Sequence, residues 1–183
     1  MPIKHLILGG ARSGKSAYAE TTARKIALQH NKQLVYLATA QAHDDEMLKR
    51  IEKHKLKRSD NNWLLVEKSL NLAPELDRAT SEQCILVDCL TLWLSNCLHH
   101  TCWESQKESF LVALKKCSAD VIMVSNEVGT GIVPMGELSR RFVDESGALH
   151  QNLANLCHEV TLVVAGLPLT LKVINDPIGK TQL

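Results

Sequence analysis

One short run near the amino terminus combines residue types whose spacing is suited to phosphate chemistry. It reads Gly9-Gly10-Ala11-Arg12-Ser13-Gly14-Lys15-Ser16, which is the P-loop spacing Gly-x-x-x-x-Gly-Lys-Ser. The glycines let successive backbone N–H groups face one anion, and the helix that follows adds partial positive charge. In such a loop Lys15 reaches the β- and γ-phosphates, and the Ser16 hydroxyl is a Mg²⁺ ligand. The run therefore predicts a site for a nucleoside triphosphate.

Two carboxylates follow apolar runs that have the composition of buried strands. Asp88 closes the run 84–88, and we expect it at the end of a neighbouring strand, where it would hold the hydrated metal ion. The alternative is that Asp88 only caps the helix that begins at Leu90. Glu127 follows the run 121–125 and is a second carboxylate at the same edge, as a metal ligand or a base. Ligands of open α/β sheets bind beyond the carboxyl ends of the strands, so these groups should converge there.

A basic segment surrounds one histidine that could act as a nucleophile. The basic residues between positions 49 and 58 are Lys49, Arg50, Lys53, His54, Lys55, Lys57 and Arg58. His54 shares a helix face with Met47 and Ile51, and the cations around it favour the neutral imidazole. A neutral imidazole among cations that bind phosphates could form a phosphoramidate at an α-phosphate. The alternatives are a packed or surface histidine and a solvated basic face.

The elements that must position these residues alternate between strands and helices along the whole chain. Strands are predicted at 3–8, 34–38, 63–67, 84–88, 121–125 and 160–165, with a further strand at 169–174. Helices are predicted at 16–29, 44–57, 73–80, 90–98, 104–117 and 137–158. Buried strands that alternate with helices indicate an α/β fold, with a mostly parallel sheet and helices on both faces. We expect one domain over residues 1–183.

Composition excludes several functional classes. The formal net charge is +1 and aromatic residues make up 4% of the 183 residues, which argues against a nucleic-acid-binding protein. No apolar run reaches the ~18 residues of a membrane-spanning helix, and no signal peptide is visible, so we expect a cytoplasmic protein. The six cysteines lie in or beside apolar runs and are interpreted as small buried hydrophobes. The cluster from Cys97 to Cys102 matches no zinc spacing.

The sequence also argues against a switch GTPase. Such a protein would carry Asn-Lys-x-Asp to recognise guanine, but Asn31-Lys32-Gln33-Leu34 lacks the aspartate. The segment Asp144-Glu145-Ser146-Gly147 has the spacing Asp-x-x-Gly, yet it falls inside a predicted helix.

Several blocks in a fixed order carry a resemblance to a known family. They are the P-loop run, Ala38-Thr39-Ala40, Asp44-Asp45-Glu46-Met47, Arg50-Ile51-x-x-His54-Lys55, Ser125 to Pro134, and Val164 to Leu169. The sequence closely resembles the bifunctional adenosylcobinamide kinase/adenosylcobinamide-phosphate guanylyltransferase of cobalamin synthesis. The resemblance implies a P-loop NTPase (RecA-like) fold, a homotrimer, and a corrinoid substrate.

The same resemblance implies two reactions and a set of site residues. ATP or GTP phosphorylates the hydroxyl of adenosylcobinamide; GTP then guanylylates a histidine, here His54, and the GMP passes to adenosylcobinamide phosphate to form adenosylcobinamide-GDP. By this resemblance Lys15 contacts the phosphates of the triphosphate as a catalytic residue, and Ser16 and Asp88 hold Mg²⁺. The implied nucleotide contacts are the P-loop, Ala38, Thr39, Ala40, Lys55, Leu56, Lys57, Arg58, Glu67 and Asp88. Two alternatives are a plain small-molecule P-loop kinase and a non-catalytic nucleotide-binding regulator.

Overall fold

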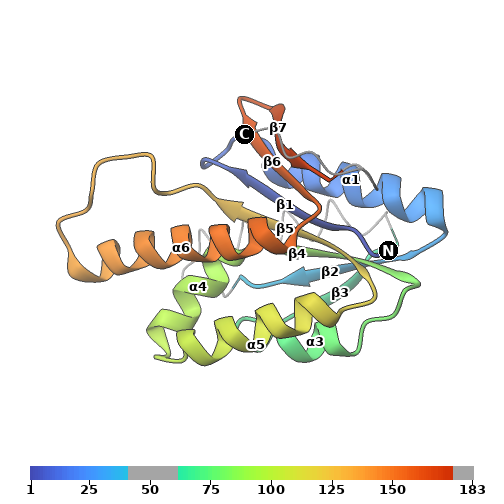
Figure 1. Ribbon diagram of the computed structural model, residues 1–183, viewed down its shortest axis with the longest axis horizontal. Coiled ribbons are helices and arrows are strands. Elements are labelled where there is room, and N and C mark those ends of the chain that lie inside the picture. Colours follow the sequence, from blue (N-terminus) through green and yellow to red (C-terminus); the bar gives the residue numbers. More distant parts are fainter. Residues whose placement is uncertain (41–61, 175–183) are drawn as a thin grey trace.

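The fold is organised around one sheet. The computed structural model describes residues 1–40 and 62–174. Its strands are β1 (Lys4–Gly9), β2 (Gln33–Ala38), β3 (Leu64–Glu67), β4 (Gln83–Asp88), β5 (Asp120–Asn126), β6 (Glu159–Val164) and β7 (Leu167–Val173). In this part of the chain they form a seven-stranded sheet in the order β3-β2-β4-β5-β1-β6-β7 (Figure 1). Every pair is parallel except β6 with β7, so the prediction of a mostly parallel sheet is confirmed.

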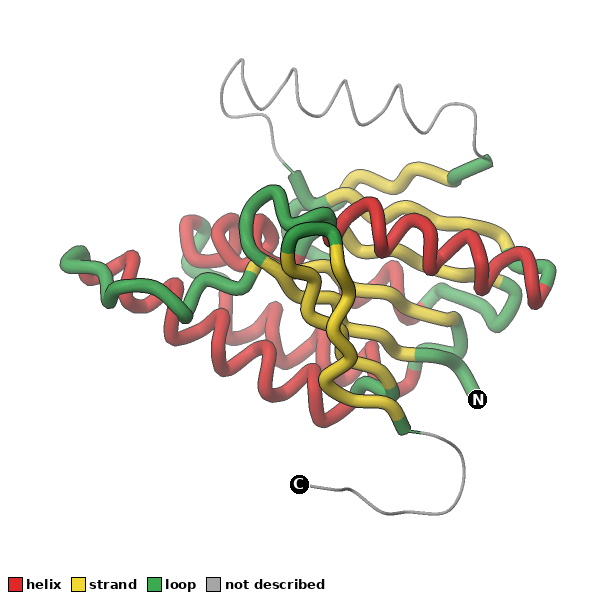
Figure 2. The backbone as a smooth tube through the Cα atoms, turned by 90° about the horizontal axis from the view of Figure 1, so that it is seen from above, coloured by secondary structure: helices red, strands yellow, loops and turns green. Residues whose placement is uncertain are grey.

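Helices cover both faces of the sheet. They are α1 (Lys15–His30), α3 (Ala73–Asp77), α4 (Leu90–His99), α5 (Trp103–Lys116) and α6 (Glu137–Leu156). Helix α1 packs on one face, and α3 to α6 pack on the other (Figure 2). The alternation within β1 shows the division, since Ile7 joins the core under α1 while Leu6 and Leu8 join the core on the opposite face. Strands buried on both faces explain the nearly continuous apolar runs in the sequence.

The predicted elements agree with the structure except at some ends. The predicted helix 44–57 lies outside the described residues, and each of the other predicted elements has a counterpart. Helix α6 stops at Leu156 instead of 158, because the chain turns into β6 there: the His158 N–H donates to the Lys4 carbonyl at 2.8 Å, and β6 begins at Glu159. Helix α3 stops at Asp77 instead of 80. The segment Asp144 to Gly147 lies within α6, as predicted.

The larger core is aromatic and sulfur-rich. Trp93 packs against Trp103 and Phe110, with ring centroids 5.2 and 4.8 Å apart, and its indole N–H donates to the Leu70 carbonyl at 2.6 Å. The buried free cysteines of this core are Cys97, Cys117 and Cys157, and Cys84 is buried in the core under α1. Cys89 and Cys102 are only half-buried, so the prediction of six buried cysteines is wrong for these two. Burial raises the pKa of the Cys84, Cys97 and Cys157 thiols to about 12, so these side chains behave as hydrophobes. None of the described helices is both long and apolar enough to cross a membrane.

Candidate active site

The P-loop connects β1 to α1 and has the backbone conformation that its glycines and lysine predict. Gly14 is the N-cap of α1 with φ of 95°, and Arg12 is also left-handed with φ of 57°. Only glycine adopts the Gly14 conformation without strain. The buried Lys15 side chain folds over the loop, and its Nζ donates to the Gly10 carbonyl at 3.0 Å. The loop therefore curls around a point at the start of α1.

The start of α1 is suited to an anion. The first backbone N–H groups of a helix lack intrahelical acceptors and lie at its positive end. Within the described residues no side chain caps this end, and the first turn of α1 contains no acidic residue. The buried Ser13 hydroxyl also lacks a hydrogen-bond partner among residues 1–40 and 62–174. Free donors at a positive helix end fit a phosphate group.

The hairpin between β6 and β7 supports the P-loop from one side. The Gly166 N–H donates to the Ser13 carbonyl at 2.8 Å. A Cβ on Gly14 would lie 3.2 Å from the Gly166 Cα, so the two backbones are in close contact. The turn itself has Ala165 and Gly166 at positive φ, 52° and 80°. Val164 to Leu169 stand out as a block in the sequence, but the sequence gives no signal of this contact with the P-loop.

Replacement of Gly9 by alanine is expected to disturb the loop. Its Cβ would lie 2.5 Å from the Val163 carbonyl oxygen, and that backbone cannot move away because Gly9 and Val163 are partners in the β1–β6 ladder. Gly9→Ala should lower the free energy of unfolding by about 1–3 kcal/mol. Chemical denaturation would measure this. The matched control is Gly10→Ala, because no described heavy atom lies within 4 Å of a Cβ there; equal stability of the two variants would contradict the steric argument.

Asp88 ends β4, but β4 is not the immediate neighbour of the P-loop strand. The sequence placed Asp88 on a neighbouring strand, whereas the structure inserts β5 between β1 and β4. Two strand spacings separate the ends of β1 and β4 by about 10 Å. The Tyr36 hydroxyl donates to Asp88 Oδ2 at 2.6 Å and orients the carboxylate. The N-cap of α4 is Cys89, so the alternative in which Asp88 caps that helix is wrong.

Ser16 and Asp88 have the chemistry of a magnesium site. Both are half-buried, and they supply a hydroxyl and a carboxylate oxygen. Mg²⁺ prefers oxygen ligands and keeps several of its waters, so ligands on either side of a gap can share one hydrated ion. The donor set therefore fits Mg²⁺.

Thr39 joins the turn after β2 to the end of β4. Its hydroxyl donates to the Cys89 carbonyl at 2.7 Å and accepts the Cys89 N–H at 2.8 Å. Its own carbonyl accepts from the Asn96 side chain at 3.0 Å. Thr39 is fully buried, so its side chain positions the Ala38–Ala40 turn.

The remaining predicted residues are not gathered around the P-loop in the described part of the chain. Glu67 is exposed at the end of the edge strand β3, four strands from β1, which corresponds to about 19 Å along the sheet. Glu67 and Lys15 could therefore contact only different parts of an extended nucleotide. His54, Lys55, Leu56, Lys57 and Arg58 lie outside the described residues.

A buried chain of polar side chains that was not predicted from the sequence lies behind Glu127. His150 Nε2 lies 2.8 Å from the Ser125 hydroxyl, which lies 3.3 Å from the Thr91 hydroxyl. The other ring nitrogen, Nδ1, lies 3.9 Å from Glu127 Oε2. Burial lowers the pKa of His150, although Glu127 opposes the shift. The available signal was a histidine on the apolar face of α6, beside Leu149 and one turn before Leu153.

Comparison with known proteins decides the family. The cobinamide kinase / cobinamide phosphate guanyltransferase family (CobU) matches residues 5–171. The chain belongs to this family. It is 47% identical to the bifunctional adenosylcobalamin biosynthesis protein CobP of Pseudomonas aeruginosa, over 93% of this chain and 98% of that protein. It is 37% identical to the protein CobU of Escherichia coli, over 91% of this chain and 98% of that protein. The resemblance noted in the sequence is confirmed.

The fold of this CobU family member is shared with a distant solved structure. The flagellar accessory protein FlaH of Methanocaldococcus jannaschii aligns with a TM-score of 0.52 at 13% identity, covering 93% of this chain and 78% of that one. The predicted P-loop NTPase (RecA-like) fold is confirmed.

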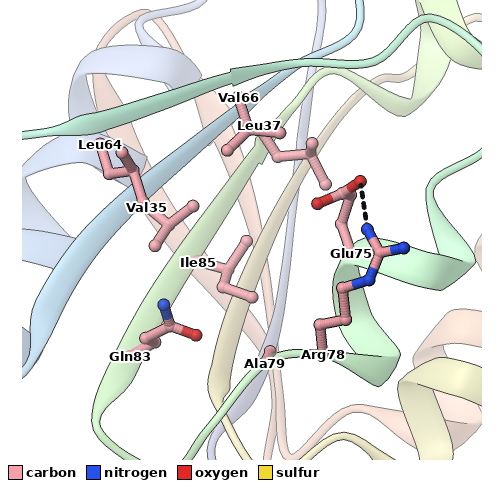
Figure 3. Close-up of a pocket in the computed structure, with 9 residues that line it drawn as sticks. All are labelled: Val35, Leu37, Leu64, Val66, Glu75, Arg78, Ala79, Gln83 and Ile85. Atoms are coloured by element: carbon pink, nitrogen blue, oxygen red, sulfur yellow. Dashed lines mark ion pairs between the residues drawn. The ribbon is translucent and has the colours of Figure 1, made fainter.

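A small cavity of this CobU family member lies apart from the P-loop. It measures about 120 Å³ and lies under the edge of the sheet against α3 (Figure 3). Its lining is mostly apolar and includes Val35, Leu37, Val66 and the Glu75–Arg78 ion pair at 3.7 Å. Those side chains come from the strands, from α3 and from its C-cap Arg78, and none of them belongs to the P-loop.

Proposed function

We infer that this protein is a bifunctional enzyme of adenosylcobalamin biosynthesis, a cobinamide kinase and cobinamide phosphate guanylyltransferase. Family membership over most of the chain supports both activities. The first reaction transfers the γ-phosphoryl group of ATP or GTP to the hydroxyl of adenosylcobinamide. The second transfers GMP from GTP to adenosylcobinamide phosphate and gives adenosylcobinamide-GDP. The observation that carries the proposal is the P-loop at the uncapped, acid-free start of α1.

The P-loop residues are proposed to hold the triphosphate in both reactions. The loop from Gly9 to Ser16 would wrap the phosphates with backbone N–H groups at the start of α1, and Lys15 would leave the Gly10 carbonyl to pair with the β- and γ-phosphates. Ser16 and Asp88 would hold Mg²⁺, with Tyr36 fixing the Asp88 carboxylate. The ion supplies charge neutralisation at the phosphates when it is bound.

His54 is proposed as the nucleophile of guanylyl transfer. Its imidazole nitrogen would attack the α-phosphorus of GTP, and pyrophosphate would leave as the N–P bond forms. The phosphate of the corrinoid then attacks the same phosphorus, and the imidazole leaves. A covalent intermediate divides one difficult displacement into two easier ones.

The residues beyond the P-loop are proposed to bind the rest of the guanine nucleotide. Ala38, Thr39 and Ala40 form the turn after β2, and Glu67 ends the neighbouring strand in register with Ala38. A nucleotide that extends from the P-loop along the ends of the strands would reach them. Lys55, Leu56, Lys57 and Arg58, next to His54, are proposed to contact the same nucleotide.

The protein is proposed to act in the cytoplasm as a homotrimer. Its proposed substrate partner is the corrinoid, and no nucleic-acid partner is proposed. Two exposed apolar surfaces support self-association. One is the edge strand β7, where Leu167, Leu169 and Leu171 are exposed. The other is the β5–α6 connection, which extends away from the sheet (Figure 1) and exposes Ile132 and Met135 almost completely.

The experiment that tests the proposal uses the full-length protein and two labelled nucleotides. ATP labelled at the γ-phosphate should transfer its label to adenosylcobinamide. GTP labelled at the α-phosphate should leave an acid-labile, alkali-stable label on the protein, and adenosylcobinamide phosphate should remove it. Phosphoryl transfer without protein label would instead support a plain kinase. Nucleotide binding with neither transfer would support a non-catalytic regulator.

A further inference from the structure

Glu127 lies directly beside the P-loop strand. It follows β5, which pairs with β1 so that Gly9 is opposite Asn126, and its N–H donates to the Gly9 carbonyl at 3.0 Å. Because β5 lies between β1 and β4, Glu127 occupies the gap between the P-loop and Asp88 at the ligand-binding edge. Its side chain is 27% exposed, so solvent or a substrate can reach the carboxylate.

The carboxylate of Glu127 is held from two sides. Its Oε1 accepts the Gly129 N–H at 2.6 Å, which closes a tight turn just after β5. Its Oε2 lies 3.9 Å from His150 Nδ1, an electrostatic contact longer than a hydrogen bond. A carboxylate held in this way keeps lone pairs for a further proton donor.

One proton order of the chain behind Glu127 would hold its carboxylate. In that order the neutral His150 ring turns Nδ1–H toward Glu127, because a carboxylate cannot donate, and accepts at Nε2. The Ser125 hydroxyl would then donate to Nε2, 2.8 Å away, and the Thr91 hydroxyl to Ser125, 3.3 Å away. Thr91 in turn accepts the Asn126 N–H at 2.6 Å. The hydrogen bond at Nε2 orients the imidazole, and Nδ1 faces Glu127 across 3.9 Å.

We propose that Glu127 accepts the proton of the substrate hydroxyl in the kinase reaction, and that His150, Ser125 and Thr91 are the residues that position it. This proposal rests on the proposed function. As the hydroxyl oxygen bonds to the γ-phosphorus, its O–H bond breaks and the proton moves to Glu127. The bond from the γ-phosphorus to the bridging oxygen breaks, and the nucleoside diphosphate leaves with that electron pair. Glu127 afterwards releases the proton to water.

Loss of the Glu127 carboxylate should affect the two reactions of the enzyme differently. Phosphoryl transfer to a hydroxyl requires a proton acceptor, whereas guanylylation of a neutral imidazole does not involve that hydroxyl. Glu127→Gln keeps the size of the side chain and removes its basicity. We expect kcat for adenosylcobinamide phosphorylation to fall about 100-fold with little change in KM, while GTP labels the protein as before. The matched control is Glu137→Gln, at the exposed start of α6.

Three outcomes with the Glu127→Gln variant would overturn the assignment. An equal loss of both reactions would mean that Glu127 only maintains the P-loop. Recovery of Glu127→Gln at raised Mg²⁺ concentration would make it a metal ligand. Undiminished kinase turnover would exclude it as the proton acceptor. Wild-type protein that lacks both reactions would refute the proposed function, and this assignment with it.

Two substitutions of His150 test its positioning role. The Asn side-chain amide reproduces the Nδ1 donor that faces Glu127, whereas the Gln amide reproduces the Nε2 position that contacts Ser125. We expect His150→Gln to lower kinase kcat about 10-fold and His150→Asn to keep most of the wild-type kcat. Protein labelling by GTP should be unchanged in both variants. The reverse order of the two variants, or equal loss in both, would contradict the positioning role.

Discussion

Lys15→Ala is expected to lower both phosphoryl transfer and protein guanylylation about 10³-fold, because both reactions need the triphosphate neutralised at the same place. The Lys15 ammonium already lies against the loop carbonyl of Gly10, so it needs only a short movement to reach bound phosphates. The two labelled-nucleotide assays would measure the losses separately.

The control for this variant is Lys25→Ala, which removes an exposed lysine from the same helix and should leave both reactions at the wild-type level. Thermal unfolding should show that Lys15→Ala is folded, so that lost activity reflects lost charge. Full guanylylation in Lys15→Ala would contradict a shared triphosphate site and would require a second one.

His54→Ala should abolish protein labelling by GTP while adenosylcobinamide phosphorylation stays within about threefold of wild type. In the proposed mechanism the covalent intermediate forms on the imidazole nitrogen, so its removal would eliminate the two-step route. The proposed phosphoryl transfer uses the P-loop and a hydroxyl nucleophile and would not need His54. The direct measurement is the label that stays on the protein after incubation with α-labelled GTP. Gel electrophoresis detects it, before and after acid treatment.

His30→Ala serves as the matched control, since it removes an exposed histidine at the end of α1 and should leave labelling unchanged. A label that persists in His54→Ala would place the nucleophile on another residue. Parallel loss of both reactions would show instead that His54 supports binding of the triphosphate.

The sequence predicted the P-loop and most elements because their signals are local. Gly9 to Ser16 carry their conformation in their own residue types: Gly14 adopts a positive φ, and Lys15 folds over the loop. The strand ending at Asp88 was identifiable because burial on both faces leaves a continuous apolar run. The last residue of β2, Ala38, and the turn after it were likewise recognisable as a block.

The sequence could not predict which strand ends meet. The order of strands depends on pairings between distant segments, and apolar runs such as those of β4 and β5 pair equally well with several neighbours. In the structure β5 lies between β1 and β4, so Glu127 and not Asp88 lies next to the P-loop strand. It also left Glu67 at the far edge of the sheet.

The residue types and spacing of one loop were sufficient to predict a site for a nucleoside triphosphate, and the ordered blocks were sufficient to indicate the family of this chain. Only the tertiary structure brought the β6–β7 hairpin against Ser13 and placed His150 of α6 behind Glu127. The physical reason is that a phosphate loop is specified by backbone conformation within a few residues. A buried polar chain, in contrast, requires side chains from three separate elements to reach hydrogen-bonding distance, which only packing decides.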